Sequence, residues 1–168
     1  MSSRRRFVFS AAASLTALAA ARHHFLPAAM ATSATGPYPV THTDAEWHKL
    51  LTPDQYAVLR GADTERPYSS PLNSEHRAGI FACAGCAQSL FSSRTKFDSH
   101  TGWPSFWAPL PRAVATRRDW SLGMERNEVH CSRCGGHLGH VFDDGPPPTG
   151  QRYCMNGLAM TFEPGATR

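Results

Sequence analysis

No acidic side chain occurs in the first 43 residues, because the first one in the chain is Asp44. Of the 17 basic residues, Arg4, Arg5, Arg6 and Arg22 precede Asp44, and the other 13 balance the 13 acidic residues. The net charge of +4 therefore belongs to the leader, and the rest of the chain is neutral. Since nucleic-acid-binding domains carry their basic excess in the folded part, this balance argues against nucleic acid as a partner.

Outside the leader there is also no apolar run of about 18 residues, the length that a membrane-spanning helix needs. We therefore expect no membrane span in the mature chain. The composition, 41% hydrophobic and 18% charged, is typical of a globular chain rather than a disordered one. The residues after the leader suffice for one domain with a core and hardly for two.

The N-terminus has the features of an export signal. An arginine run precedes the apolar stretch from Phe7 to Ala21, and small residues permit cleavage before Thr32. The opening order SRRRFV is similar to a twin-arginine signal, whose pathway exports folded proteins. We predict a signal peptide over residues 1–31 and a location in the bacterial periplasm. A transit peptide that directs the chain to an organelle is the alternative.

The body of the chain begins with helix signals. Residues 32–43 are expected to form a polar linker, and residues 44–165 a single domain. A short helix is predicted from Asp44 to Leu51. Thr52 is a good N-cap and is followed by proline and an acidic residue, so a second helix is predicted up to residue 59 or 60.

From Gly79 onward the helical period disappears. Short apolar or alternating runs are separated by Gly, Pro, Asn and Asp, which indicates a mainly β domain of antiparallel strands with irregular loops. The expected strands cover residues 80–82, 89–92, 114–117, 120–126, 128–130, 138–142 and 158–162.

Four of the five cysteines form two CxxC pairs. The first pair is Cys83 and Cys86, and the second is Cys131 and Cys134. The 44 residues between Cys86 and Cys131 separate the pairs, and glycines accompany both. Two tight turns that each present two thiolates are suited to a tetrahedral zinc ion, with a structural role because no ligand position stays open. Two disulfides are the alternative for an exported protein.

The fifth cysteine, Cys154, has no partner of this kind. In an extended strand its side chain shares one face with those of Arg152 and Asn156. The apolar alternation reverses after Asn156-Gly157, which indicates a bulge or kink there. A thiol beside a guanidinium and a backbone irregularity is a candidate nucleophile. A small buried hydrophobic residue is the alternative.

His137 and His140 follow the second CxxC pair closely. Residues three apart on a regular strand face opposite sides, so the two imidazoles can serve one site only if Gly139 or the preceding glycines break the strand geometry. Otherwise they are additional metal ligands, or one of them is a core histidine with its hydrogen bonds satisfied. Trp103 lies in an aromatic loop, where it either packs in the core or lines a ligand site.

The motifs taken together resemble the methionine-R-sulfoxide reductase B family, of which GWPSF, HLGHVF and RYCxN are highly specific signatures. The similarity covers essentially all of residues 44–164, in order. It implies two antiparallel sheets flanked by short helices, a β-tent, with a structural zinc on the four CxxC thiolates. The segments that carry it are 47–60, 65–67, 79–106, 125–145 and 152–162.

This resemblance implies reduction of the R epimer of methionine sulfoxide, mainly within proteins. Cys154 would be the attacking thiolate. His137, His140 and Asn156 would bind and protonate the sulfoxide oxygen, directly or through water. A sulfoxide sulfur is a poor electrophile until its oxygen is protonated, so both an acid and a nucleophile are needed. Cys154 would be left as a sulfenic acid.

By the same resemblance, Trp103 would pack against the sulfonium methyl group of the substrate, and Arg152 would support the electrostatics of the site. Many members of the family carry a resolving cysteine where this chain has Thr101. We therefore expect an outside thiol, namely thioredoxin, glutaredoxin or glutathione, to reduce Cys154. His100 stands where glycine is more usual.

Two other functions remain open at the level of sequence. A zinc-binding scaffold of the same fold would have no use for the Cys154 thiol. A zinc hydrolase would use His137 and His140 with a metal-bound water, and it would need an open coordination position that four thiolates do not leave.

Overall fold

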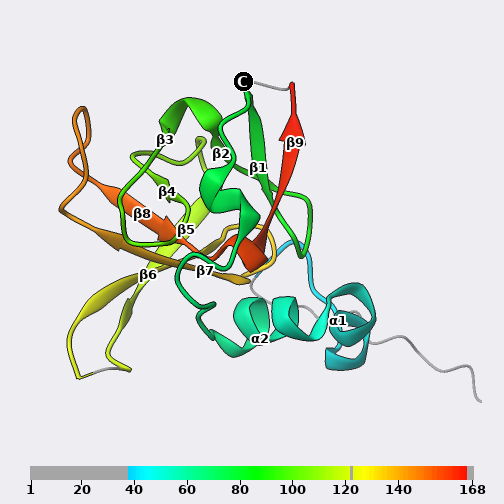
Figure 1. Cartoon of the computed structure of the whole chain (residues 1–168). Helices are drawn as coiled ribbons and strands as arrows, with labels where there is room; N and C mark the ends of the chain where they lie inside the picture. The colour runs from blue at the N-terminus through cyan, green and yellow to red at the C-terminus, as the bar shows by residue number, and fades with distance from the viewer. Residues whose placement is uncertain (1–37, 122, 166–168) are drawn as a thin grey trace, which may run out of the picture. The chain divides into compact units, whose positions relative to one another are not determined.

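Two antiparallel sheets and two short α-helices make up the part of the chain that the structure describes (Figure 1). This computed structural model describes residues 38–121 and 123–165. The predicted signal peptide, residues 1–31, lies outside them. No helix within the described ranges is long and apolar enough to cross a membrane.

Both helices form where the sequence predicts them. Helix α1 (Asp44–Leu50) and helix α2 (Pro53–Gly61) each begin with a capping box, made by Thr43 with Glu46 and by Thr52 with Gln55. The caps satisfy backbone N–H groups that have no partner within a helix. Each helix is short, so it depends on burying a few apolar side chains, which are Trp47 in α1 and Val58 and Leu59 in α2.

The smaller sheet has the strand order β2-β1-β9 and the larger one the order β3-β4-β8-β7-β6-β5. All the pairings are antiparallel, which confirms the predicted fold class. The strands of the smaller sheet are β1 (Gly79–Cys83), β2 (Ser89–Ser92) and β9 (Met160–Pro164). Those of the larger sheet are β3 (Lys96–Phe97), β4 (Ser105–Phe106), β5 (Val114–Asp119), β6 (Arg126–Cys131), β7 (His137–Phe142) and β8 (Arg152–Met155).

The core lies where the two sheets pack against each other. Phe81 on β1 and Phe91 on β2 contact Phe106 on β4, with ring centroids 4.9 and 4.4 Å apart. All three rings are fully buried. Because β4 pairs with β8, this aromatic cluster supports the strand that carries Cys154.

One expected strand, 120–126, is wrong. These residues include the turn between β5 and β6, where Arg126 donates to Asp119 Oδ2 at 2.6 Å across the hairpin. Trp120 and Met124 are each 60% exposed. Their apolar side chains give the sequence a strand-like pattern, although no sheet face buries them.

The expected strand 158–162 also differs from the structure. Gly157–Ala159 is a single 3-10 turn, η3, which precedes β9. The turn confirms the kink predicted after Asn156, and it moves Asn156 from the strand to the N-cap of η3. The two-residue strands β3 and β4 have no counterpart among the expected ones.

The described end of the predicted linker contacts the domain. The backbone N–H of Val40 donates to the carbonyl of Arg133 at 2.9 Å, and the Tyr38 ring packs edge-on against His130. Residues 38–43 therefore lie along the second CxxC turn and lead directly into α1.

Candidate functional site

The four CxxC cysteines converge into one cluster, as predicted. Their sulfurs lie within 4.8 Å of one another. The Cys83 and Cys134 sulfurs are 3.7 Å apart, and those of Cys86 and Cys131 are 3.6 Å apart. These separations exceed the bond length of a disulfide, about 2.05 Å, and all four thiols are free. The cluster can hold one metal ion.

Two matching turns form the cluster. Ala87 N–H donates to the Cys83 carbonyl at 2.8 Å, and Gly135 N–H donates to the Cys131 carbonyl at 2.9 Å. The first turn follows β1 in the smaller sheet, and the second follows β6 in the larger one. An ion bound here would join the two sheets, with all four ligand positions taken by protein.

A second set of polar side chains forms a row across the larger sheet. Ser105 on β4 lies opposite Cys154 on β8, which lies opposite His140 on β7. His140 in turn lies opposite Glu128 on β6, and Glu128 lies opposite Arg117 on β5. Directly paired residues of antiparallel strands point to the same face, so one row brings a thiol, an imidazole and a carboxylate together.

Cys154 is half-buried in this row. Its sulfur lies 3.8 Å from the Thr101 hydroxyl oxygen. Burial raises the pKa of the Cys154 thiol, while the Thr101 and Ser105 hydroxyls and the charge of Arg152 act in the opposite direction. Attack by the thiolate therefore requires groups that favour the anion at the moment of reaction.

Arg152 shares the face of Cys154 on β8, as predicted. Its guanidinium lies over the Phe142 ring, 4.4 Å from the centroid, and forms a bidentate pair with Asp144 at 2.8 Å for both bonds. The hydrogen bonds from Arg152 lower the pKa of Asp144. The pair fixes a positive charge close to the thiol.

His137 is held in one orientation. Its Nδ1 lies 2.8 Å from Glu128 Oε1. Arg117 also contacts the Glu128 carboxylate, with one nitrogen on each oxygen. Burial lowers the pKa of His137, and Glu128 partly opposes this. The ring is only 4% exposed, and its Nε2 has no hydrogen-bond partner among the described residues.

Glu128 can serve as an anionic partner for His137 because it stays ionised. Burial raises the pKa of Glu128, but hydrogen bonds from Arg117 and His137 outweigh that effect and leave the pKa below its ordinary value. The carboxylate therefore fixes the Nδ1–H tautomer of His137, which turns Nε2 into the free nitrogen.

His140 contacts the other acidic residue of the region. Its Nε2 lies 2.8 Å from Asp119 Oδ2, and the two imidazole centroids of His137 and His140 are 5.5 Å apart. The pKa of Asp119 is lowered, first by the N–H of Ser121 and then by His140. The structure thus brings both predicted histidines together.

Gly139 explains how the imidazoles of His137 and His140 reach one region although they lie three residues apart on β7. The pairing of β6 with β7 shifts register between Val129 and His130, and Gly139 has φ of +155°. A Cβ on Gly139 would lie 2.1 Å from the carbonyl oxygen of Cys154. Only glycine lets β7 approach β8 this closely.

Asn156 and Trp103, the other two residues predicted for the site, both bond to Glu65. The Asn156 amide oxygen accepts from the N–H of Glu65 at 3.0 Å, and its NH2 donates to the Leu138 carbonyl at 3.2 Å. The Trp103 indole N–H donates to the Glu65 carbonyl at 3.1 Å. The Asn156 amide therefore ties three segments together, and its predicted contact with the sulfoxide oxygen remains a proposal.

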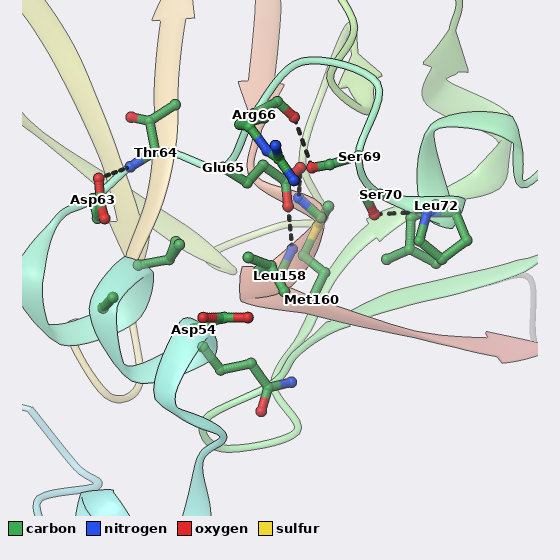
Figure 2. A pocket seen from close by; sticks show the side chains of 15 residues that line it. Asp54, Asp63, Thr64, Glu65, Arg66, Ser69, Ser70, Leu72, Leu158 and Met160 are labelled. Atoms are coloured by element: carbon green, nitrogen blue, oxygen red, sulfur yellow. Dashed lines mark hydrogen bonds between the residues drawn. The ribbon is translucent and has the colours of Figure 1, made fainter.

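A cavity of about 650 Å³ lies beyond Glu65, between α2, the 63–72 loop and η3 (Figure 2). The Glu65 carboxylate accepts from the N–H groups of Gly157 and Leu158 at 2.6 and 2.8 Å. None of the residues predicted for the reaction lines this cavity. The cavity is therefore lined by other residues than the row on the larger sheet.

Sequence reasoning missed the carboxylates behind the histidines. Glu128 and Asp119 become partners of His137 and His140 only through strand register. One signal was available for Glu128, because an acidic residue just before the buried run Val129 to Cys131 must find a partner. Asp119 gave no such signal.

Comparison with known proteins agrees with these features. The SelR domain family matches residues 51–164. A peptide methionine sulfoxide reductase MsrB from Agrobacterium fabrum is 53% identical over 126 residues, which cover 74% of this chain and 93% of the relative. Proteins of the same name from Leifsonia xyli and Methanosarcina barkeri are each 53% identical, over 77% and 74% of this chain and 94% and 88% of their own lengths. The chain belongs to the methionine-R-sulfoxide reductase B family.

Proposed function

We propose that this protein reduces methionine-R-sulfoxide in oxidised proteins and that Cys154 is the nucleophile. The observation that carries the proposal is the row in which Cys154 lies directly opposite His140, with His137 beside it. The family membership and the names of the relatives support the substrate. No other described cysteine is outside the four-sulfur cluster.

The reaction requires one thiol and one acid. The Cys154 sulfur forms a bond to the sulfoxide sulfur, the protonated oxygen leaves that sulfur and ends on Cys154, and methionine departs. A thiol and a sulfoxide thus become a sulfenic acid and a thioether, with two electrons passing from Cys154 to the substrate. The atoms balance without another reactant.

His137 is the proposed acid at the sulfoxide oxygen. Its Nδ1 is engaged by Glu128, and its buried Nε2 is free to donate when protonated. His140, which Asp119 holds, and Asn156 would orient the oxygen, and Trp103 would contact the methyl group of the substrate. A donor that is buried and already oriented needs little reorganisation energy to stabilise the transition state.

Recycling of Cys154 depends on an outside thiol in this proposal. Thr101 lies 3.8 Å from the Cys154 sulfur, where it offers a hydroxyl instead of a second thiol. Two thiols from thioredoxin, glutaredoxin or glutathione would convert the sulfenic acid to a thiol, releasing water and a disulfide. Zinc-bound cysteines are poor substitutes, because their loss would destabilise the fold.

The metal that fits the four-cysteine cluster is zinc. A tetrahedral zinc with Zn–S bonds of about 2.3 Å separates its sulfurs by about 3.8 Å. The observed pairs at 3.6 and 3.7 Å match that spacing. The ion would be structural, tying the turn after β1 to the turn after β6, and it would take no part in sulfoxide chemistry.

We further propose export of the protein, on the basis of its sequence. Residues 1–31 combine an arginine run with an apolar stretch, and export in the folded state would allow metal loading in the reducing cytoplasm. The periplasm is the proposed location, with an organelle as the alternative. Fractionation of cells that express the full chain tests this, because accumulation of unprocessed protein in the cytoplasm would contradict it.

Turnover of separated sulfoxide epimers tests the proposed activity. We expect the purified protein to reduce peptide methionine-R-sulfoxide with dithiothreitol and to leave the S epimer unchanged. A Cys154→Ser variant should lose the activity while retaining its metal and its unfolding temperature. Equal activity of the variant and the wild type would exclude Cys154 as the nucleophile.

A further inference from the structure

Three linked hydroxyl groups lie beside Cys154, and the last of them belongs to Ser105, its cross-strand partner. Thr101 Oγ1 lies 3.8 Å from the Cys154 sulfur and 2.8 Å from Ser99 Oγ, which lies 2.7 Å from Ser105 Oγ. Ser105 Oγ in turn donates to the Trp103 carbonyl at 3.2 Å. We infer that this line, hereafter the hydroxyl chain of Ser99, Thr101 and Ser105, controls the deprotonation of Cys154, with Ser99 as a positioning residue that acts through its neighbours.

The terminal carbonyl sets the direction of the chain while Cys154 is a thiol. A carbonyl only accepts hydrogen bonds, so Ser105 donates its hydroxyl hydrogen to the Trp103 carbonyl and accepts a hydrogen bond from Ser99. Ser99 must then accept from Thr101, and Thr101 accepts from the thiol S–H. In this direction Cys154 is a donor, and S–H is a weak one.

Loss of the thiol proton reverses the preferred direction of the hydrogen bonds along the chain. A thiolate accepts hydrogen bonds and does not donate them, and bonds from O–H to an anion are about twice as strong as neutral ones. Ser105 would turn its hydrogen from the Trp103 carbonyl toward the thiolate opposite it or toward Ser99. Ser99 would donate to Thr101, and Thr101 would donate to the thiolate. Hydroxyl groups rotate without moving their heavy atoms, so this reversal requires no rearrangement of the fold.

The loop that carries the chain is held in a fixed shape. Tyr68 donates from its backbone N–H to the Gly102 carbonyl at 2.7 Å and from its hydroxyl to the His100 carbonyl at 2.8 Å. These two carbonyls flank Thr101. Tyr68, His100 and Gly102 all have positive φ, of 62°, 57° and 94°. For Tyr68 and His100, which carry side chains, such backbone strain persists only where surrounding contacts enforce it, and here those contacts hold the Thr101 hydroxyl beside the sulfur.

Charged and titratable side chains also lie near Cys154, on its own strand and on the neighbouring one. Arg152 on β8 is paired with Asp144, and His140 on β7 is paired with Asp119. His137 stands behind His140 with Glu128 as its partner. The variants described below alter none of these groups, so a change in Cys154 reactivity would report on the hydroxyl chain.

Ser99 gives the sharper test because it acts at a distance. Its hydroxyl bonds to Thr101 and Ser105, and within the described ranges no bond joins it to Cys154. A side chain that only fills space would leave the ionisation of Cys154 unchanged when it is shortened. A member of the hydroxyl chain would shift that ionisation, because a Thr101 hydroxyl that accepts a hydrogen bond from Ser99 is polarised and becomes a stronger donor to the thiolate.

The test is the pH dependence of Cys154 alkylation, measured with iodoacetamide and site-resolved mass spectrometry on the metal-loaded protein. The inference assumes the proposed nucleophile, but this readout does not involve sulfoxide. We expect Thr101→Val to shift the alkylation profile to higher pH and to slow alkylation about fivefold at neutral pH, the effect of one lost hydrogen bond. Ser99→Ala should shift the profile in the same direction by a smaller amount, because it removes only the bond that strengthens Thr101 as a donor. Ser99→Thr should restore the profile.

A matched control is Ser69→Ala, which removes a hydroxyl that bonds to the Arg66 carbonyl outside the chain. It should leave the alkylation profile unchanged. If Ser99→Ala fails to fold, Thr101→Val alone decides, because valine keeps the shape of threonine. Profiles of Ser99→Ala or Thr101→Val that superimpose on the wild type would overturn the inference, whereas active Cys154→Ser protein would overturn the proposed function instead.

Discussion

Cys154 and His140 are direct partners in the register of β8 with β7, so the thiol and the imidazole leave the same face of the larger sheet. Each has a second group behind it: Thr101 lies beside Cys154 and Asp119 beside His140. The proposed nucleophile and a group proposed to bind the sulfoxide oxygen are therefore positioned by rigid strands, and the loops add the groups that contact them.

Glu128 is expected to matter because it orients His137. Glu128→Gln keeps the size of the side chain but removes the charge that fixes the Nδ1–H tautomer. We expect kcat for R-sulfoxide reduction to fall about tenfold or more, with a smaller change in KM, since the acid acts in the transition state. Steady-state kinetics measures this. An unchanged kcat would show that His137 needs no carboxylate partner.

Glu128 also predicts a dependence of stability on pH. Its pKa in the folded state lies below the ordinary value of 4.5, so its contribution is complete above that value and is lost as the pH falls through the folded pKa. The free energy of unfolding should therefore decrease on acidification below about pH 4.5, and it should decrease less in Glu128→Gln. Urea titrations at a series of pH values, with wild type and variant in parallel, measure the difference.

Gly139 is expected to be intolerant of any side chain. In Gly139→Ala the new Cβ would meet the Cys154 carbonyl oxygen at 2.1 Å, and the backbone that holds it cannot give way without separating β7 from β8. We expect a loss of about 2–4 kcal/mol in unfolding free energy, measured by urea titration, together with most of the activity. The control is Gly150→Ala, which also has positive φ, +72°, but has open space around it. It should cost about 1 kcal/mol and leave activity intact.

Loss of the proposed zinc site should weaken the whole domain. The cluster joins segments from both sheets, so Cys131→Ser should abolish stoichiometric zinc binding and lower Tm by roughly 10 °C or more. Elemental analysis and thermal unfolding measure the two effects. Cys154→Ser is the control, which should keep one zinc per chain. Metal-free wild-type protein with two disulfides would contradict the zinc assignment.

Thr101→Cys should install a resolving thiol. The Thr101 hydroxyl oxygen is already 3.8 Å from the Cys154 sulfur, so a thiol at this position needs only a small approach to form a disulfide. After one turnover the variant should contain a disulfide between residues 101 and 154, and its rate with thioredoxin should exceed that of the wild type. Thr101→Ser, which adds no thiol, is the control and should show neither change.

The parts of the fold that local sequence determines were predictable. The caps at Thr43 and Thr52 act within four residues, and the helices they start match the prediction. The kink after Asn156 was visible in the reversed apolar alternation. Both CxxC pairs were predictable as one site because two turns that each present two thiolates suit one tetrahedral ion.

The parts that strand register determines were not predictable. Strands β3 and β4 contain two residues each, so only their partners define them. The same is true of the contacts of Ser99, Ser105 and Glu128, which come from segments that meet only in the folded sheet. The error at 120–126 arose because exposed apolar side chains in a turn have the same pattern as a buried strand.

The most direct test of the central claim is a single turnover without reductant. The wild-type protein, incubated with excess peptide methionine-R-sulfoxide, should release one methionine per chain and stop. Mass spectrometry with dimedone should then place one sulfenic acid on Cys154 and none on the four clustered cysteines. A disulfide between Cys154 and one of those cysteines would contradict the account, because a metal ligand would then be the resolving thiol.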